Sequence, residues 1–68
     1  MKVILNNLTE KLPFNDSLTI SELLEYKKFS FKMLVIKING VLIKKDKYNT
    51  AYIKDGDIVD VIHLISGG

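Results

Sequence analysis

The absence of cysteine is the feature that most limits what this chain can fold into. The chain has 68 residues, and domains of this size bury only about 60% of the surface that the unfolded chain exposes. Small domains often compensate with disulfides or a structural metal, but without cysteine and with a single histidine, His63, neither is available here. The hydrophobic residues, 47% of the chain, must therefore build the core of one regular, well-patterned domain.

Composition also excludes several classes of function. Without cysteine there is no thiol nucleophile and no cysteine-ligated zinc. The ten cationic side chains are all lysines, and a net charge of +2 does not indicate a nucleic-acid binder. Apolar runs such as residues 33–36 are far shorter than the roughly 20 residues of a membrane span, and the first residues lack a signal-peptide hydrophobic region. We therefore expect a cytoplasmic protein.

The start of the chain predicts a β-hairpin. Residues 2–7 are rich in β-branched and large apolar side chains, which favours a strand. Asn6-Asn7 follows and indicates a tight turn, because asparagine tolerates positive φ. Residues 8–14 then alternate as a returning strand, and Pro13, which has no N–H, places that strand at a sheet edge.

A short helix is predicted over residues 20–28. Thr19 and Glu22 have the spacing of a capping box, in which each side chain accepts a hydrogen bond from the other residue's N–H. Leu18 and Leu23 occupy the positions of a hydrophobic staple around that cap. These signals fix where the helix begins.

The second half of the chain predicts further strands. Asn39-Gly40 between two apolar runs is a strong hairpin signal. The expected elements are a buried strand over 33–39, a returning strand over 41–45, a single helical turn over 46–50, a turn over 55–57 and a last strand over 58–64. Two hairpins joined by a helix, with a final strand, indicate an α+β fold of one sheet and one helix.

The four glycines divide into two groups. Gly40 and Gly56 supply positive φ in turns, whereas Gly67 and Gly68 end the chain, where no fold requires them. No phosphate-binding glycine loop is present. The terminal pair is either a reactive tail that can thread a narrow channel in a partner enzyme, or an incidental floppy terminus.

Taken in order, several segments resemble the ThiS family of ubiquitin-like β-grasp sulfur carriers. The matching segments are VILN (3–6), LTISELL (18–24), IKING (36–40), KDGD (54–57) and GG (67–68). The resemblance implies an α+β, ubiquitin-like β-grasp fold, with a mixed sheet of four to five strands packed on one helix. Three positions depart from the family pattern: Val41 stands where glutamate is frequent, Tyr48 where tryptophan is frequent and Ser66 where alanine is common.

The resemblance implies a protein substrate rather than an enzyme. Residues 1–64 would form the single domain and residues 65–68 a flexible tail, with Ser66, Gly67 and Gly68 as its reactive end. A ThiF-like adenylating partner would use MgATP to activate the Gly68 carboxylate, and a sulfur donor such as a cysteine desulfurase would supply the sulfur for a thiocarboxylate. That group would donate sulfur to a ThiG-like thiazole synthase in thiamine biosynthesis. The chain itself would bind no cofactor or metal and hold no catalytic residue.

Other interpretations stay open. A β-grasp carrier could serve another pathway, such as molybdopterin or a sulfur-containing amino acid, or act as a protein modifier. The chain could also be a ubiquitin-like binding module without tail chemistry. An enzyme is the least favoured interpretation, because the sequence shows no constellation of catalytic groups.

Strand parity predicts a docking surface beside the tail. Val59 and Val61 in the last strand are expected to point into the core, so the alternate residues point away from the helix. The residues expected on this outer face for partner docking are Ile62, Leu64, Ile58 and Ile4, with Val35 beside them. An exposed apolar patch next to a reactive terminus suits a partner site. The alternative is that these side chains only cover sheet surface.

A few polar residues have plainer interpretations. His63 is expected to be a strand residue near the tail rather than a catalytic base. Lys44, Lys45 and Lys47 are expected to form a solvated rim, although they could also meet an acidic surface of a partner. Tyr48 is expected to pack under the last connection.

Overall fold

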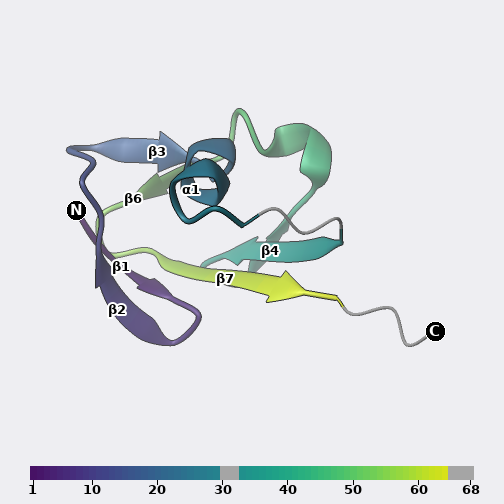
Figure 1. Ribbon diagram of the computed structural model, residues 1–68, viewed down its shortest axis with the longest axis horizontal. Coiled ribbons are helices and arrows are strands. Elements are labelled where there is room, and N and C mark those ends of the chain that lie inside the picture. Colours follow the sequence, from purple (N-terminus) through teal and green to yellow (C-terminus); the bar gives the residue numbers. More distant parts are fainter. Residues whose placement is uncertain (30–32, 65–68) are drawn as a thin grey trace.

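The computed structural model describes residues 1–29 and 33–64. Within them, five strands form one sheet in the order β2-β1-β7-β4-β5, and two short strands, β3 and β6, form a second sheet. The helix α1 lies on one side of the larger sheet (Figure 1). The elements are β1 (Lys2–Leu5), β2 (Leu8–Lys11), β3 (Ser17–Thr19), α1 (Ile20–Tyr26), β4 (Leu34–Ile38), β5 (Val41–Ile43), the 3-10 helix η1 (Lys45–Lys47), β6 (Tyr52–Lys54) and β7 (Ile58–His63).

The larger sheet is mixed because β1 and β7, its first and last strands in chain order, are parallel neighbours. Ile4 pairs with Ile58 and Leu5 with Val59 in the parallel β1–β7 ladder, whereas β1–β2, β4–β7 and β4–β5 are antiparallel. Parallel neighbours need a crossover connection, and the chain makes it with α1 and the elements that follow. The predicted α+β fold, with one mixed sheet on one helix, is confirmed.

Both predicted hairpin turns are present. Asn6 and Asn7 have φ values of 50° and 68°, and Asn39 and Gly40 have φ values of 50° and 82°. Positive φ at both central residues defines the turn type whose twist matches the flanking strands. The asparagines therefore set the register of β1 against β2 and of β4 against β5.

The second strand is shorter than the predicted range of 8–14. β2 ends at Lys11, opposite Lys2, the first residue of β1, and the N–H of the next residue, Leu12, donates to the Met1 oxygen at 2.8 Å. Beyond it, the N-terminal ammonium of Met1 donates to the carbonyl oxygens of Leu12 and Phe14 at 3.0 and 2.9 Å. Pro13 lies outside the strand, and β2 is an edge strand as predicted.

The helix begins where the sequence predicts. The N–H of Glu22 donates to Thr19 Oγ1 at 3.1 Å, and the N–H of Thr19 donates to Glu22 Oε1 at 2.8 Å, which completes the capping box.

The helix ends earlier than the predicted residue 28. Lys28 has a φ of 58°, and its N–H donates to the Glu25 oxygen, while the N–H of Phe29 donates to the Leu24 oxygen at 2.8 Å. This pair of bonds is a Schellman motif, which closes α1 after Tyr26 without a glycine.

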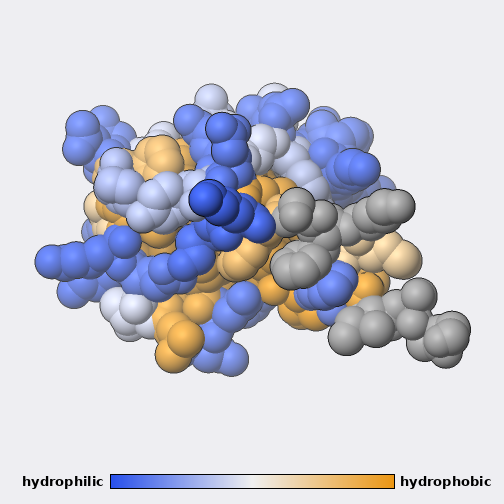
Figure 2. Space-filling model, in the orientation of Figure 1, coloured by the Kyte–Doolittle hydropathy of each residue, from blue (hydrophilic) through white to orange (hydrophobic). Residues whose placement is uncertain are grey.

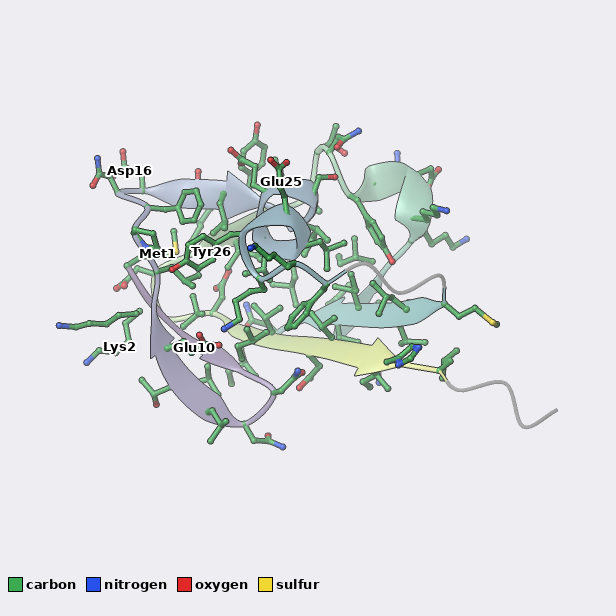
Figure 3. The ribbon with its side chains drawn as sticks, viewed as in Figure 1. Met1, Lys2, Glu10, Asp16, Glu25 and Tyr26 are labelled. Carbon is green, nitrogen blue, oxygen red and sulfur yellow. The ribbon has the colours of Figure 1, made fainter. Side chains whose placement is uncertain are left out.

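Two contacts hold the helix against β2 and the segment that follows it, and Figure 3 labels Glu10 and Tyr26, one partner of each contact. Lys27 Nζ forms an ion pair with Glu10 Oε1 on β2. The rings of Phe14 and Tyr26 meet edge to face, with centroids 5.7 Å apart. The end of α1 is thereby attached to the edge of the sheet that lies farthest from β5.

The core lies between α1 and one face of the larger sheet. Val59 and Val61 are buried, as predicted from strand parity. The buried hydrophobic residues among those described are Val3, Leu5, Leu12, Leu18, Ile20, Leu23, Ile36, Ile53, Val59 and Val61. The buried set reaches along β7 to Val61, so the strand that precedes the tail is fixed by the core on one side.

The strands β3 and β6 are absent from the sequence prediction, so the predicted order of strand, strand, helix, strand, strand, strand was wrong. Each has three residues, too few to show an alternating pattern. Leu18 pairs with Ile53, and both are buried. The residues of β3 were interpreted only as the cap of the helix, and this pairing closes the core at the start of α1.

Candidate functional site

The base of the C-terminal tail is fixed by the sheet. Leu64 directly follows β7, and its N–H donates to the Met33 oxygen at 2.9 Å. The predicted reactive residues Ser66, Gly67 and Gly68 lie outside the described residues, as does the predicted flexible segment 65–68. The described site is therefore the platform from which the tail continues.

The outer face of the sheet carries the four predicted docking residues. The β1–β7 ladder places Ile4 opposite Ile58, and the β4–β7 ladder places Val35 opposite Ile62, so these side chains share the face away from α1. The relative exposures of Ile4, Ile58, Ile62 and Leu64 are 38, 46, 45 and 44%. All four are accessible, as the sequence predicts.

A charged pair divides this face into two parts. Lys37 lies opposite Asp60 in the β4–β7 ladder, between the two apolar groups. Ile58 and Ile62 are four residues apart along β7, which is about 13 Å. Only Ile62 and Leu64 adjoin the base of the tail, whereas Ile4 and Ile58 lie at the other end of the face.

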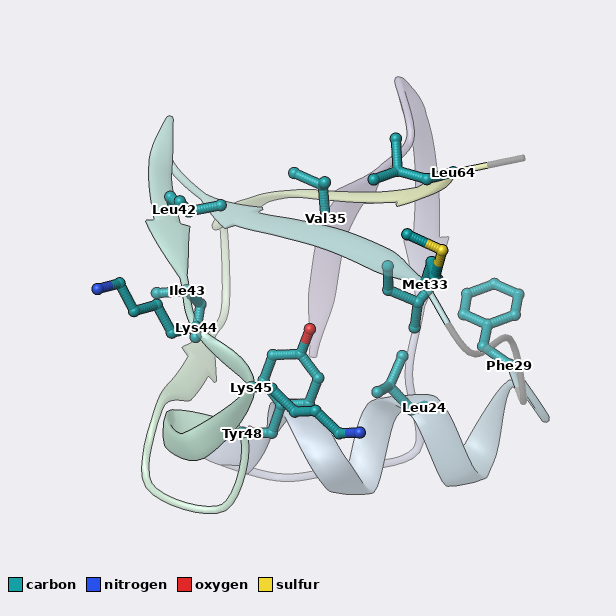
Figure 4. Close-up of a pocket in the computed structure, with 11 residues that line it drawn as sticks. Leu24, Phe29, Met33, Val35, Leu42, Ile43, Lys44, Lys45, Tyr48 and Leu64 are labelled. Carbon is teal, nitrogen blue, oxygen red and sulfur yellow. The ribbon is translucent and has the colours of Figure 1, made fainter. Parts of the chain in front are cut away.

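Leu42 belongs to the same face and was missed by the sequence prediction. It pairs with Lys37 in the β4–β5 ladder and is 56% exposed. Val35, Leu42 and Leu64 lie along one side of the sheet, with Val35 between the other two and Leu64 next to the tail (Figure 4). The Asn39-Gly40 turn fixes the parity of β5, so the signal that could have revealed Leu42 was present. Hydrophobic surface is visible at the end of β4 and β7 that lies next to the tail (Figure 2).

Two asparagine side chains hold β7 in place. Asn6 Oδ1 accepts the N–H of Val61 at 2.8 Å, next to the first hairpin turn. Asn39 Oδ1 accepts the N–H of Ile58 at 2.9 Å, and its Nδ2 donates to Asp57 Oδ1 at 3.1 Å. The turn residues identified from sequence therefore also satisfy backbone groups of the strand that presents the tail.

A cavity opens between α1 and the β5 edge of the sheet (Figure 4). It has a volume of about 480 Å³, and its described lining includes Leu24, Ile43 and Tyr48, with Lys44 and Lys45 at its border. Burial raises the pKa of the Tyr48 hydroxyl above its ordinary value of 10.0. Tyr48 is half-buried and packs against the core, as the sequence predicts.

The remaining polar residues form no metal centre within the described parts of the chain. No group of three or more histidine, aspartate or glutamate side chains gathers there. His63 ends β7 opposite Leu34, with the parity of the buried valines, so it does not lie on the outer face. Asp55 Oδ1 accepts the N–H of Lys2 at 2.7 Å and therefore has a structural role in the turn. The helix in residues 1–29 and 33–64 is too short to cross a membrane.

Comparisons with known proteins agree on one family. The model of the ThiS family matches residues 3–68. The uncharacterized protein ycf40 of Porphyra purpurea is 36% identical over 58 residues, 82% of each chain, and the sulfur carrier protein ThiS of Bacillus subtilis is 28% identical over 53 residues, 78% of this chain and 80% of that one. The crystal structure of the thiamine biosynthesis protein ThiS from Geobacter metallireducens superposes with a TM-score of 0.88 at 25% identity, covering all of both chains.

Proposed function

Because this chain belongs to the ThiS family and is a ubiquitin-like β-grasp sulfur carrier rather than an enzyme, we propose that its Gly68 carboxylate is the group that carries the sulfur. A ThiF-like enzyme adenylates the carboxylate, a sulfur donor such as a cysteine desulfurase supplies the sulfur, and a ThiG-like synthase receives it for thiazole formation. MgATP is used by the adenylating partner, and this chain binds no cofactor.

The chemistry explains why a main-chain terminus is used. A carboxylate oxygen of Gly68 attacks the α-phosphorus of ATP, and pyrophosphate leaves. The resulting acyl-adenylate has a good leaving group, so a hydrosulfide ion from the sulfur donor can attack the carbonyl carbon and displace AMP, which leaves the thiocarboxylate. Gly67 and Gly68 have no Cβ, which allows the chain to enter a narrow channel in the partner. A cysteine-free chain is compatible with this scheme, because no side-chain thiol takes part.

One observation carries the proposed presentation of the tail. β7 is held by β1 and β4 on its two sides, and the chain leaves it at Leu64, which is tied to Met33. Exposed Ile62 and Leu64 lie at that end. We assign partner docking next to the tail to these two residues, and Ile4 and Ile58 to the outer part of the same contact.

The direct test is the intact mass of the chain with its native C-terminus after incubation with a ThiF-like enzyme, MgATP and a sulfur donor. The expected product is heavier by the difference between one sulfur and one oxygen atom. Removal of Gly68 should abolish the product. An unchanged mass, without ATP-dependent release of pyrophosphate, would contradict the proposal and favour a binding module.

Ile62→Asp tests the docking assignment separately from the chemistry. A charge on the exposed apolar face should slow adenylation at least about tenfold while changing the free energy of unfolding by less than about 0.5 kcal/mol. Val41→Asp is the matched control, because Val41 is 63% exposed and lies at the opposite end of the sheet, next to the Asn39-Gly40 turn. Equal adenylation rates for the parent and Ile62→Asp would remove Ile62 from the contact.

A further inference from the structure

The sheet has an uncovered step along its β5 edge. The last β4–β5 pair is Ile36 with Ile43, whereas the β4–β7 ladder continues to Leu34. After Ile43 the chain leaves the sheet and enters η1. Among the described strands, Leu34 and Val35 therefore have a neighbour on the β7 side only. We call this open length of edge, together with the cavity beside it, the β4 slot.

Backbone geometry turns the β4 slot into a place for another strand. Ile38 and Val41 flank a two-residue turn, so they form a hydrogen-bonded pair. Hydrogen-bonded and non-hydrogen-bonded pairs alternate along an antiparallel ladder. Ile36 and Leu34 therefore direct their N–H and C=O groups to the β5 side, as Ile38 does. The bond from Leu64 to the oxygen of Met33 agrees with this alternation, because it places Met33 on the β7 side. Leu34 thus offers a donor and an acceptor to an added strand.

The walls of the β4 slot are apolar on both sides of that edge. Val35, Leu42 and Leu64 line it on the outer face, and Leu24 and Tyr48 line it towards the helix (Figure 4). The cavity volume of about 480 Å³ lies within the range of pockets that hold small ligands, so it has room for an apolar side chain. A strand laid along Leu34 and Val35 would place alternate side chains on these two walls.

The charged side chains around the β4 slot indicate which kind of segment it can bind. The charged residues that line the cavity are Lys44 and Lys45, and Lys47 follows within one turn, with Asp46 between them as the single acidic residue of this segment. All three lysines are exposed. Lysines beside an open strand edge discourage pairing with a second copy, which would bring its own lysines to the same place. A segment with carboxylates on either side of an apolar residue complements them.

We propose that the β4 slot binds an extended acidic segment of a partner protein by strand addition. The added backbone pairs with Leu34, an apolar side chain enters the cavity, and flanking carboxylates meet Lys44 and Lys45. The inference does not depend on the proposed sulfur chemistry. It adds a contact surface on the edge of the sheet, bordering the docking face at Val35 and Leu64.

The test is a titration of the full chain with short synthetic peptides, followed by amide chemical shifts. The probe is acetyl-EDVFVDE-amide, and the matched peptides are acetyl-KKVFVKK-amide, which reverses the charge, and acetyl-EDVPVDE-amide, which cannot complete the ladder. The acidic probe should shift the amides of Leu34, Val35 and Ile43 and slow hydrogen exchange at Leu34. Both matched peptides should bind at least about fivefold more weakly.

Paired charge reversals provide the control on the protein side. Lys44→Glu combined with Lys45→Glu should weaken binding of the acidic probe about fivefold or more, and the loss should shrink at high salt. Lys2→Glu combined with Lys11→Glu makes the same change of charge at the far edge, where Lys2 pairs with Lys11, and should leave binding unchanged. Amide spectra of both variants verify that they are folded.

Four outcomes would overturn the proposal. They are the absence of saturable binding, equal binding of the acidic and basic peptides, shifts confined to Ile4, Ile58 and Ile62, and concentration-dependent self-association through the amides of the β4 slot without peptide. The third outcome would assign the peptide to the docking face, and the fourth would assign the edge to a second copy. None of these results bears on whether Gly68 is adenylated, so the two proposals fail independently.

Discussion

Asn39 illustrates how one side chain can serve a turn and a neighbouring strand. Its positive φ suits the hairpin turn, and its amide oxygen accepts the N–H of Ile58 at the start of β7. The amide nitrogen also donates to Asp57, whose Oδ2 accepts the N–H of Lys54. The start of β7 therefore depends on a residue in a different part of the chain.

Asn39→Gly should lower the free energy of unfolding by about 1–2 kcal/mol in urea denaturation. Glycine accepts the positive φ, so the loss reports the two side-chain hydrogen bonds rather than backbone strain. Asn7→Gly is the control, because Asn7 also has positive φ but makes no side-chain hydrogen bond among the described residues. A loss of the same size in both variants would show that the Asn39 amide contributes nothing.

Tyr48 should give the protein a specific alkaline sensitivity. Burial raises its pKa in the folded state above 10.0, so the phenol stays protonated in the folded chain at a pH where it ionises in the unfolded chain. The contribution of the protonated phenol to the free energy of unfolding is complete at a pH below its pKa in the unfolded chain. It is lost as the pH rises through its pKa in the folded chain. Between about pH 8 and pH 11, the parent should therefore lose more stability than Tyr48→Phe. Parallel curves of unfolding free energy against pH for the two proteins would contradict this assignment.

Residue types in the sequence predicted the turns, but they did not predict the hydrogen bonds that the turn asparagines make to β7. Asn6 and Asn39 were identified because asparagine tolerates positive φ, which is a local property. Their bonds to Val61 and Ile58 join residues far apart in the chain, and no local pattern encodes such a pairing.

At the scale of elements, the start of α1 was predictable and its end was not. The capping box is a fixed spacing of two side chains, so Thr19 and Glu22 identify the start of the helix from sequence. A Schellman motif usually has a glycine at its residue of positive φ, and this glycine identifies the helix end in a sequence. Lys28 occupies that position here. The prediction extended to residue 28 because Lys27 and Lys28 suit the negative end of the helix dipole, a signal that does not identify the last helical residue.

Lys28→Gly should raise the free energy of unfolding by about 0.5–1 kcal/mol, because a lysine pays a steric cost at a φ of 58° that glycine does not. Glu25→Gly, inside α1, is the matched substitution with the opposite expected sign. Urea denaturation of both variants measures the difference. Destabilisation by Lys28→Gly would mean that the lysine side chain stabilises the helix end by more than its backbone costs.

The larger sheet was predictable because its strands carry strong turn signals and alternating patterns. The second sheet was not, since β3 and β6 have three residues each and pair across more than thirty positions of sequence, Leu18 with Ile53. The outer face followed from the parity of β7 alone. Its division by Lys37 and Asp60 required the β4–β7 register, which only the folded chain reveals.

At the scale of the whole molecule, the folded domain and the proposed chemistry are separable. The buried residues of β7 end at Val61, before the tail begins. Deletion of Gly67 and Gly68 should therefore leave the midpoint and slope of urea unfolding unchanged while abolishing sulfur loading. A shift of the midpoint would show that the last two residues contribute to the fold and that loss of loading is not specific to the tail.

The position of β7 also has a consequence for the timing of folding. β7 is the last strand in chain order, yet it lies between β1 and β4 in the middle of the sheet. The sheet cannot close until this strand inserts, and its pairing with β1 spans most of the chain, which is a slow kind of contact to form. The face that contains Val35 and Ile62 exists only after that step. A partner that recognises both residues would therefore bind only carriers that have completed folding. The terminus of a partly folded chain would not be activated, and that chain would receive no sulfur.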